Sequence, residues 1–407
     1  TTLAALERLA EPLNKWGDVT RLYDIEVEKL RAANEADRLV EMALRVAQIY
    51  EVQSGDVDSA IARYTTVLSG DDTHRQAIEA LDRLYEATER WADLAGILHR
   101  EVQTADSPDD VLSFQFRLGE VFQARLDDID GAIGQYREIL GAAPEHAPAL
   151  AALEGLFAEG VRPIVIGEIL EPLYRMSEAY DRLIGVHTVQ LSHVADPGER
   201  LGMMHKIAEI AEERANDHQT ALDWELRALL ESPRDEQANA QVDRLAQILD
   251  QWPLVAQTLA DVLETPAFAT DSETRVFVGR LLAVIYEAQL GDVGKAEEAY
   301  RFVLGADPRD RDSLEALDRL YAENGAHEAL AEVLRKRLAS VEAEDAKHPD
   351  LVDLGYRLGQ VYENDLGRPN EAIAAYRRVL DKNDPHHADS ITALAGVYTR
   401  LRDWPSL

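Results

Sequence analysis

The chain has 407 residues, no cysteine and a formal net charge of −34, from 76 acidic and 42 basic side chains. Without cysteine there are no disulfides, no thiol catalysis and no cysteine-ligated zinc. The acidic balance argues against a nucleic-acid backbone or an anionic membrane as the main partner, because both select for lysine and arginine. It favours either a basic protein partner or simply the solubility of a long chain.

No run of 18 apolar residues is present, so membrane insertion is not expected. The first nine residues lack the features of a signal peptide, which predicts a cytoplasmic location. The chain begins and ends within a repeat, so we expect it to be a fragment of a longer protein, and a targeting signal would then lie outside it. Many alanines and few lysines suggest a bacterium with a GC-rich genome, although adaptation to salt would explain them equally well.

An aromatic residue recurs between two helical segments along the whole chain. Trp16, Trp91, Trp252 and Trp404 each open such a segment, and Tyr180 and His327 take the same position in two intervening copies. The intervals are 75, 89, 72, 75 and 77 residues, which is the signature of a solenoid. We expect the tryptophans to pack in the core, where they wedge the turn between the two helices.

A second helical pair alternates with the first and is clearest around Gly291-Asp292. Apolar residues fall three and four apart on both sides of this turn, which predicts helix, tight turn and helix. Five copies share an alanine at the inner position: Ala60, Ala132, Ala221, Ala296 and Ala372. A methyl group there lets two helices approach closely, whereas a larger side chain would cost about 1–3 kcal/mol. In the third copy, Glu225 replaces the aromatic residue that usually follows the alanine.

Together these motifs resemble the tetratricopeptide repeat (TPR), a helix-turn-helix unit of about 34 residues. A leucine and a small residue precede an aromatic residue, an alanine, a second aromatic residue and a proline, as in the copy that ends at Pro308. The turn between the two helices is one residue longer than is usual in the family. The resemblance implies an all-α, right-handed α-solenoid of about eleven repeats and roughly 22 helices.

The period is broken by about 17 extra residues between Pro144 and Tyr180. They predict an additional helix after Gly160, which acts either as a junction or as a harmless addition to the outside. We therefore predict two arrays, an N-terminal one over 1–160 and a C-terminal one over 161–407.

In the TPR family the first helix of each pair lines a concave face that binds peptides or partner helices. Projection of the apolar rows places one set of acidic and one set of basic residues on or beside this face. The acidic set is Glu51, Glu86, Glu212, Glu287 and Glu363, and the basic set is Arg83, Arg244 and Arg319, with Arg8 as a fourth member. Either these residues form a groove for a charged peptide, or they pair with one another between repeats, where each exposed pair contributes only about 0–1 kcal/mol.

No phosphate-binding loop, zinc-protease motif or nucleophile elbow is present, so neither an enzyme nor a cofactor is expected. The segment 127–131 resembles a calcium loop, but Ala132 stands where a ligand is required, and the pair His386-His387 is typical of a surface. The favoured function is a non-catalytic scaffold that binds a protein. The alternatives are a self-assembling structural protein and the accessory arm of a larger enzyme or sensor.

Overall fold

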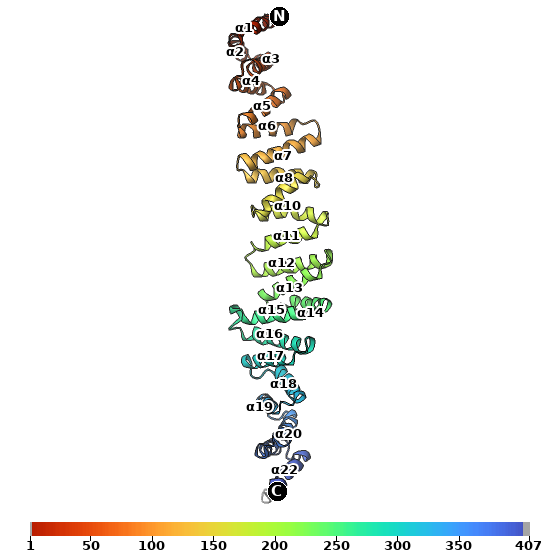
Figure 1. The fold of residues 1–407 in the computed structure, drawn as a ribbon. Coiled ribbons are helices and arrows are strands. Elements are labelled where there is room, and N and C mark those ends of the chain that lie inside the picture. The colour runs from red at the N-terminus through yellow and green to blue at the C-terminus, as the bar shows by residue number, and fades with distance from the viewer. Residues whose placement is uncertain (1, 402–407) are drawn as a thin grey trace. The chain divides into compact units, whose positions relative to one another are not determined.

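The computed structural model describes residues 2–401, which form 22 α-helices and no strand (Figure 1). Trp404 lies outside the described residues. Contacts divide the chain into two compact units, 1–177 and 178–407. Within each unit, the helices that pack together are neighbours in sequence or next neighbours. This is the arrangement of an α-solenoid, as the sequence predicted.

Unit 1 contains ten helices. They are α1 (Thr2–Leu13), α2 (Trp16–Ala32), α3 (Ala36–Ile49), α4 (Val57–Gly70), α5 (Arg75–Ala87), α6 (Trp91–Thr104), α7 (Pro108–Arg125), α8 (Ile129–Ala142), α9 (Ala147–Ala158) and α10 (Pro163–Met176). The predicted extra helix is α10, which lies in this unit. The boundary between the two compact units therefore follows α10, whereas the boundary between the two predicted arrays precedes it. The boundary at residue 160 stays a prediction about where the repeat register changes.

Unit 2 contains the other twelve helices. They are α11 (Tyr180–Leu191), α12 (Pro197–Glu209), α13 (His218–Glu231), α14 (Glu236–Leu249), α15 (Trp252–Glu264), α16 (Ser272–Val284), α17 (Val293–Ala306), α18 (Arg311–Asn324), α19 (His327–Glu344), α20 (Asp350–Gln360), α21 (Pro369–Arg378) and α22 (Ala388–Leu401). A short 3-10 helix spans Pro266–Phe268.

The helices form two kinds of pair, in agreement with the two sequence motifs. In the Trp pairs, the second helix begins at the recurrent aromatic or histidine position. Trp16, Trp91, Trp252 and His327 are the first residues of α2, α6, α15 and α19, and Tyr180 is the first residue of α11. Trp252 is buried and Trp91 is half-buried. The guanidinium carbon of Arg125 lies 4.5 Å from the centre of the Trp91 ring.

The other kind, the Gly-Asp pairs, comprises α3/α4, α7/α8, α12/α13, α16/α17 and α20/α21. In four of them the first helix ends in a π-helical turn, at Tyr50–Ser54, Ile210–Arg214, Ile285–Gln289 and Val361–Asp365. A π turn takes up one residue more than an α turn. This is how the structure accommodates the extra residue that distinguishes these turns from the usual TPR turn.

The glycine and aspartate of the turn have separate roles. Gly291 has a φ of 64°, a left-handed conformation that favours glycine, and the equivalent Gly55 and Gly367 adopt it too. Asp292 then begins the next helix, where its carboxylate accepts a hydrogen bond of 3.1 Å from the backbone N–H of Lys295. Asp128 caps α8 in the same way, so the segment that resembles a calcium loop is a helix cap.

The five inner alanines have no exposed surface at all. They lie on the second helices of the Gly-Asp pairs: Ala60, Ala132, Ala221, Ala296 and Ala372. Facing them, the first helices carry small residues, including Gly359, where a β-carbon would lie 2.2 Å from the ring of Tyr376. Backbone and ring are therefore in direct contact at this position, which explains why the first helix has a glycine there.

Candidate partner-binding surface

Four of the five predicted acidic residues, all except Glu86, lie at the π turns of the Gly-Asp pairs and are already engaged within the protein. Tyr64 donates its hydroxyl to Glu51 at 2.7 Å, and Arg83 of the next pair lies 2.5 Å from the same carboxylate. Tyr300 and Arg319 hold Glu287 in the same way, with a hydroxyl distance of 2.9 Å. We call this arrangement the Tyr–Glu–Arg triad. It joins the two helices of one pair to the first helix of the next.

The triads bury most of each carboxylate. The glutamate side chains of the four acidic positions at the π turns are between 12% and 21% exposed, whereas Arg83 is 65% exposed. Burial raises the pKa of the Tyr64 hydroxyl above its ordinary value, and its hydrogen bond to Glu51 acts in the same direction. These contacts favour the inter-repeat pairing, which the sequence left open beside a peptide groove.

The second and fifth Gly-Asp pairs lack the arginine of the triad. In the second pair Gln123 replaces the glutamate and accepts from Tyr136 at 3.0 Å, and Gly155 stands where the arginine would be. In the fifth pair Glu363 has its tyrosine at 2.7 Å, but Gly396 occupies the arginine position. Arg400, one helical turn later, forms the ion pair with Glu363 instead.

Two predicted residues are placed differently from the rest. Glu86 is 58% exposed and pairs with Arg117 at 2.7 Å, so the structure does not place it in a triad. Arg8 is exposed at the surface of α1. A second series of ion pairs links three of the Trp pairs to the first helix of the following pair: Arg45 with Glu7, Arg117 with Asp82, and Arg357 with Asp318. The sequence analysis did not identify this series.

The third Gly-Asp pair departs from the triad and opens a pocket. Glu225 takes the place of the tyrosine, while Arg244 forms a two-point ion pair with Glu212 at 2.7 and 2.5 Å. The tyrosines of the other four pairs are buried and fill this space. Without a ring, a concave pocket of about 620 Å³ lies between α12, α13 and α14. In the sequence, the signal for this pocket was Glu225 at a position where the other copies have an aromatic residue.

The pocket lining is acidic and contains two histidines. The carboxylate of Glu225 is 3% exposed and lies 2.9 Å from His205, whose other ring nitrogen lies 3.2 Å from Asp235. Burial raises the pKa of Glu225 above its ordinary value. The hydrogen bond from Arg244 lowers the pKa of Glu212 instead. The rim carries Glu209 and Glu213, which are exposed and form no ion pair in the described part of the chain.

Over residues 2–401, no group of three or more histidine, cysteine, aspartate or glutamate side chains is placed to hold a metal ion. The same residues contain no helix long and apolar enough to cross a bilayer.

The fold and these inter-repeat contacts define a helical-repeat protein of the helix-turn-helix class. The model of the tetratricopeptide repeat family matches residues 353–385, which span the fifth Gly-Asp pair. The other four Gly-Asp pairs repeat the turn and the buried alanine of the matched segment. Residues 353–385 are therefore similar to a tetratricopeptide repeat, and the other Gly-Asp pairs share the helix-turn-helix fold of this segment.

Similar solved structures are themselves TPR proteins. One is the C-terminal part of a TPR repeat-containing protein from Cytophaga hutchinsonii, with 17% identity over 64% of this chain and 98% of that chain and a TM-score of 0.30. The P58(IPK) TPR domain is 13% identical over 89% of this chain and 98% of that chain, with a TM-score of 0.21. The APC/C hetero-tetramer Cut9–Hcn1 is 14% identical over 98% of this chain and 93% of that chain, with a TM-score of 0.24. No curated protein matches the sequence.

Proposed function

We propose that this TPR protein is a non-catalytic scaffold that binds a protein partner on the face formed by the first helices of its pairs. We further propose that the pocket between α12, α13 and α14 receives a basic side chain of that partner. TPR arrays mediate protein–protein interactions, and the family is typically non-catalytic. The observation that carries the proposal is the substitution of Glu225 for a buried tyrosine, beside a pocket of this face at the third Gly-Asp pair.

The charges around this pocket support a basic partner. Glu209 and Glu213 have no cationic partner in the described chain and stand at the mouth of the pocket. A basic side chain that pairs with them also approaches the buried Glu225, where the lower effective dielectric strengthens the attraction. The formal charge of −34 adds a longer-range attraction, which raises the association rate of basic partners.

The triads determine which substitutions can test this surface. Lysine at Glu51 or Glu287 would break a triad, so a loss of binding would report a loss of packing. Glu209 and Glu213 avoid this problem because they are exposed. The matched control is the double change Glu264→Lys and Glu298→Lys, which alters the net charge equally but on exposed positions of second helices.

The test is a selection from a random-peptide phage library against three proteins: the wild type, the Glu209→Lys/Glu213→Lys variant and the control. Circular dichroism first establishes that all three are equally folded. We expect basic peptides to be enriched on the wild type and the control and to lose binding on the Glu209→Lys/Glu213→Lys variant. Peptides that bind all three proteins equally would contradict a role for this pocket, and the absence of any selected peptide would contradict the scaffold itself.

A further inference from the structure

A second pocket lies in unit 1, between α5, α6 and the start of α7. Its volume is about 320 Å³, and its lining includes Arg75, Glu79, Glu101 and Asp110. Glu101 is 6% exposed, and its Oε2 has no hydrogen-bond partner. A buried carboxylate oxygen without a donor costs free energy comparable to that of a lost hydrogen bond, or more when it is charged. The pocket therefore lacks a hydrogen-bond donor for the Glu101 carboxylate.

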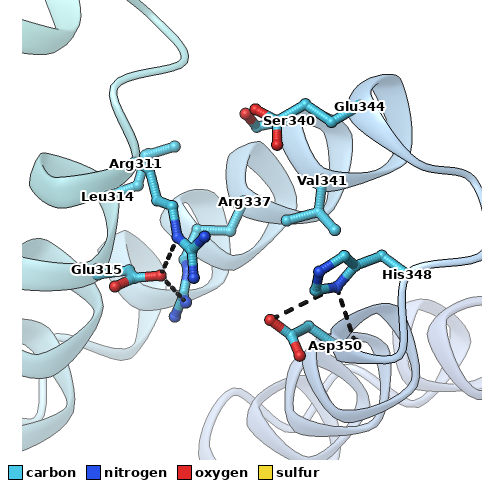
Figure 2. A pocket seen from close by; sticks show the side chains of 9 residues that line it. All are labelled: Arg311, Leu314, Glu315, Arg337, Ser340, Val341, Glu344, His348 and Asp350. Carbon is cyan, nitrogen blue, oxygen red and sulfur yellow. Dashed lines mark hydrogen bonds and ion pairs between the residues drawn. The ribbon is translucent and has the colours of Figure 1, made fainter.

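An equivalent pocket lies in unit 2, where a side chain of the protein itself supplies the hydrogen-bond donors (Figure 2). The two pockets correspond position by position: Arg75 with Arg311, Ile78 with Leu314, Glu79 with Glu315, Glu101 with Arg337, Thr104 with Ser340, and Asp110 with Asp350. Glutamate in one copy is thus arginine in the other. The volume of the unit 2 pocket is about 30 Å³, a tenth of that in unit 1.

Arg337 satisfies two carboxylates in unit 2. Its guanidinium donates to Glu315 at 3.1 Å and forms a closer pair with Asp318. Figure 2 shows Arg311 and Arg337 converging on Glu315, with a distance of 2.9 Å for Arg311. Asp318 is 4% exposed and also accepts from Arg357, so both of its oxygens are hydrogen-bonded.

The corresponding aspartate of unit 1 lacks this second guanidinium. Asp82 accepts from Arg117 at 2.6 Å through Oδ2, as Asp318 does from Arg357, but Oδ1 of Asp82 is buried without a partner. Two buried carboxylate oxygens at and beside this pocket, on Glu101 and Asp82, therefore have no hydrogen-bond donor. In the α14/α15 pair the same position is the buried Val262, so the fold also tolerates an apolar residue there.

We infer that the unit 1 pocket binds the guanidinium of an arginine on a partner protein, in the position that Arg337 takes in unit 2. A planar guanidinium offers five N–H donors in a fixed arrangement, which suits several carboxylate oxygens better than the compact ammonium of lysine does. The inference depends on the proposed function only in supposing that the partner is a protein. It concerns a separate site, in the other unit.

The electrostatics of Glu101 agree with a cationic ligand. Burial and, next, the nearby charge of Asp82 raise the pKa of Glu101 to about 7, although Arg117 opposes both effects. Glu79 also faces the site and adds negative charge. A bound guanidinium offsets this repulsion and supplies charge-assisted hydrogen bonds, which are the stronger kind.

The test measures the binding of methylguanidinium to the full chain by calorimetry, at constant ionic strength and pH 8, with methylammonium for comparison. We expect Glu101→Gln to weaken methylguanidinium binding about tenfold or more. Glu101→Arg should abolish it while raising the thermal stability, because the new guanidinium occupies the pocket. The converse variant, Arg337→Glu, should create a second methylguanidinium site in unit 2.

Equal binding by the wild type and Glu101→Arg, or equal binding of methylammonium, would overturn the inference. The result is independent of the phage selection. Methylguanidinium binding at Glu101 without any selected peptide would contradict only the scaffold. Peptides that bind with no dependence on Glu101 or on their own arginines would contradict only this site.

Discussion

Glu51, in the turn between the two helices of one pair, lies 2.5 Å from Arg83 of the next pair, and its side chain is 16% exposed. An exposed ion pair would contribute little, but here Tyr64 also donates a hydrogen bond to the same carboxylate. In a solenoid each repeat contacts only its neighbours, so such contacts determine how strongly adjacent repeats cohere. The recurrent glutamates therefore connect adjacent repeats, and the partner site proposed above lies at the Gly-Asp pair where the triad is incomplete.

The triads predict a local cost for losing one hydroxyl. We expect Tyr300→Phe to destabilise its helical pair by roughly 1 kcal/mol, because Glu287 loses a hydrogen bond in a mostly buried position. Hydrogen exchange of the amides in α16, α17 and α18 measures this change locally. Tyr286→Phe is the matched control, because its hydroxyl has no hydrogen-bond partner in the described part of the chain. Equal exchange in the two variants would contradict a stabilising triad.

Overpacking should act in the same pair through a different contact. Ala296 is fully buried where two helices meet, so Ala296→Leu should cost about 1–3 kcal/mol. Glu298→Ala, at an exposed position of the same helix, should change the stability little. Urea unfolding followed by circular dichroism compares the two variants. Similar midpoints would mean that the helices separate to admit leucine without loss.

The architecture could be predicted from the sequence because it repeats. Helical periodicity, the Gly-Asp turn and the small residue at Ala296 recur at fixed intervals, and each recurrence strengthens the same assignment. Even the extra turn residue was visible, although its form, a π turn, was not. The sequence could not show that α10 packs with unit 1, because a break in the period carries no information about which side an additional helix joins.

The sites were harder to predict because they depend on contacts between repeats. Periodicity placed Glu51 on one face of a helix, but it could not show that Tyr64 and Arg83 converge on its carboxylate. The equivalence of Glu101 and Arg337 is readable from the sequence, because both follow Trp91 and His327 at the same distance. The sequence could not show that Glu101 is buried beside Asp82, since that contact joins two different helices.

Two glycines of unit 2 should respond to alanine in opposite ways. Gly359→Ala would place a β-carbon 2.2 Å from the Tyr376 ring, so the ring or helix must move and stability should fall. Gly396 has open space around the corresponding position and lies within α22, so Gly396→Ala should stabilise by about 0.5–1 kcal/mol. Thermal unfolding of both variants checks the signs. Stabilisation by both substitutions would show that the contact between Gly359 and Tyr376 is loose.

The buried carboxyl of Glu101 predicts an unusual dependence of stability on pH. Its folded-state pKa of about 7 is raised, chiefly by burial and then by Asp82, so the folded state holds a proton that the unfolded state releases near pH 4.5. Between these two values the unfolded state binds fewer protons, and the contribution of this group therefore falls as pH rises and is constant above pH 7. Carboxylates with a lowered folded-state pKa, such as Glu212, act in the opposite sense: their contribution to stability is lost as pH falls below their unfolded-state pKa.

Glu101→Gln isolates this contribution, since glutamine imitates the neutral carboxyl at every pH. We expect the variant and the wild type to unfold at similar temperatures near pH 4.5, and the variant to be the more stable one by about 3 kcal/mol at pH 8, the scale of a pKa shift from 4.5 to about 7. Thermal unfolding across this pH range, with Glu264→Gln as an exposed control, provides the measurement. A constant difference between variant and wild type would mean that Glu101 ionises normally, and the pocket would then contain enough water to solvate its charge.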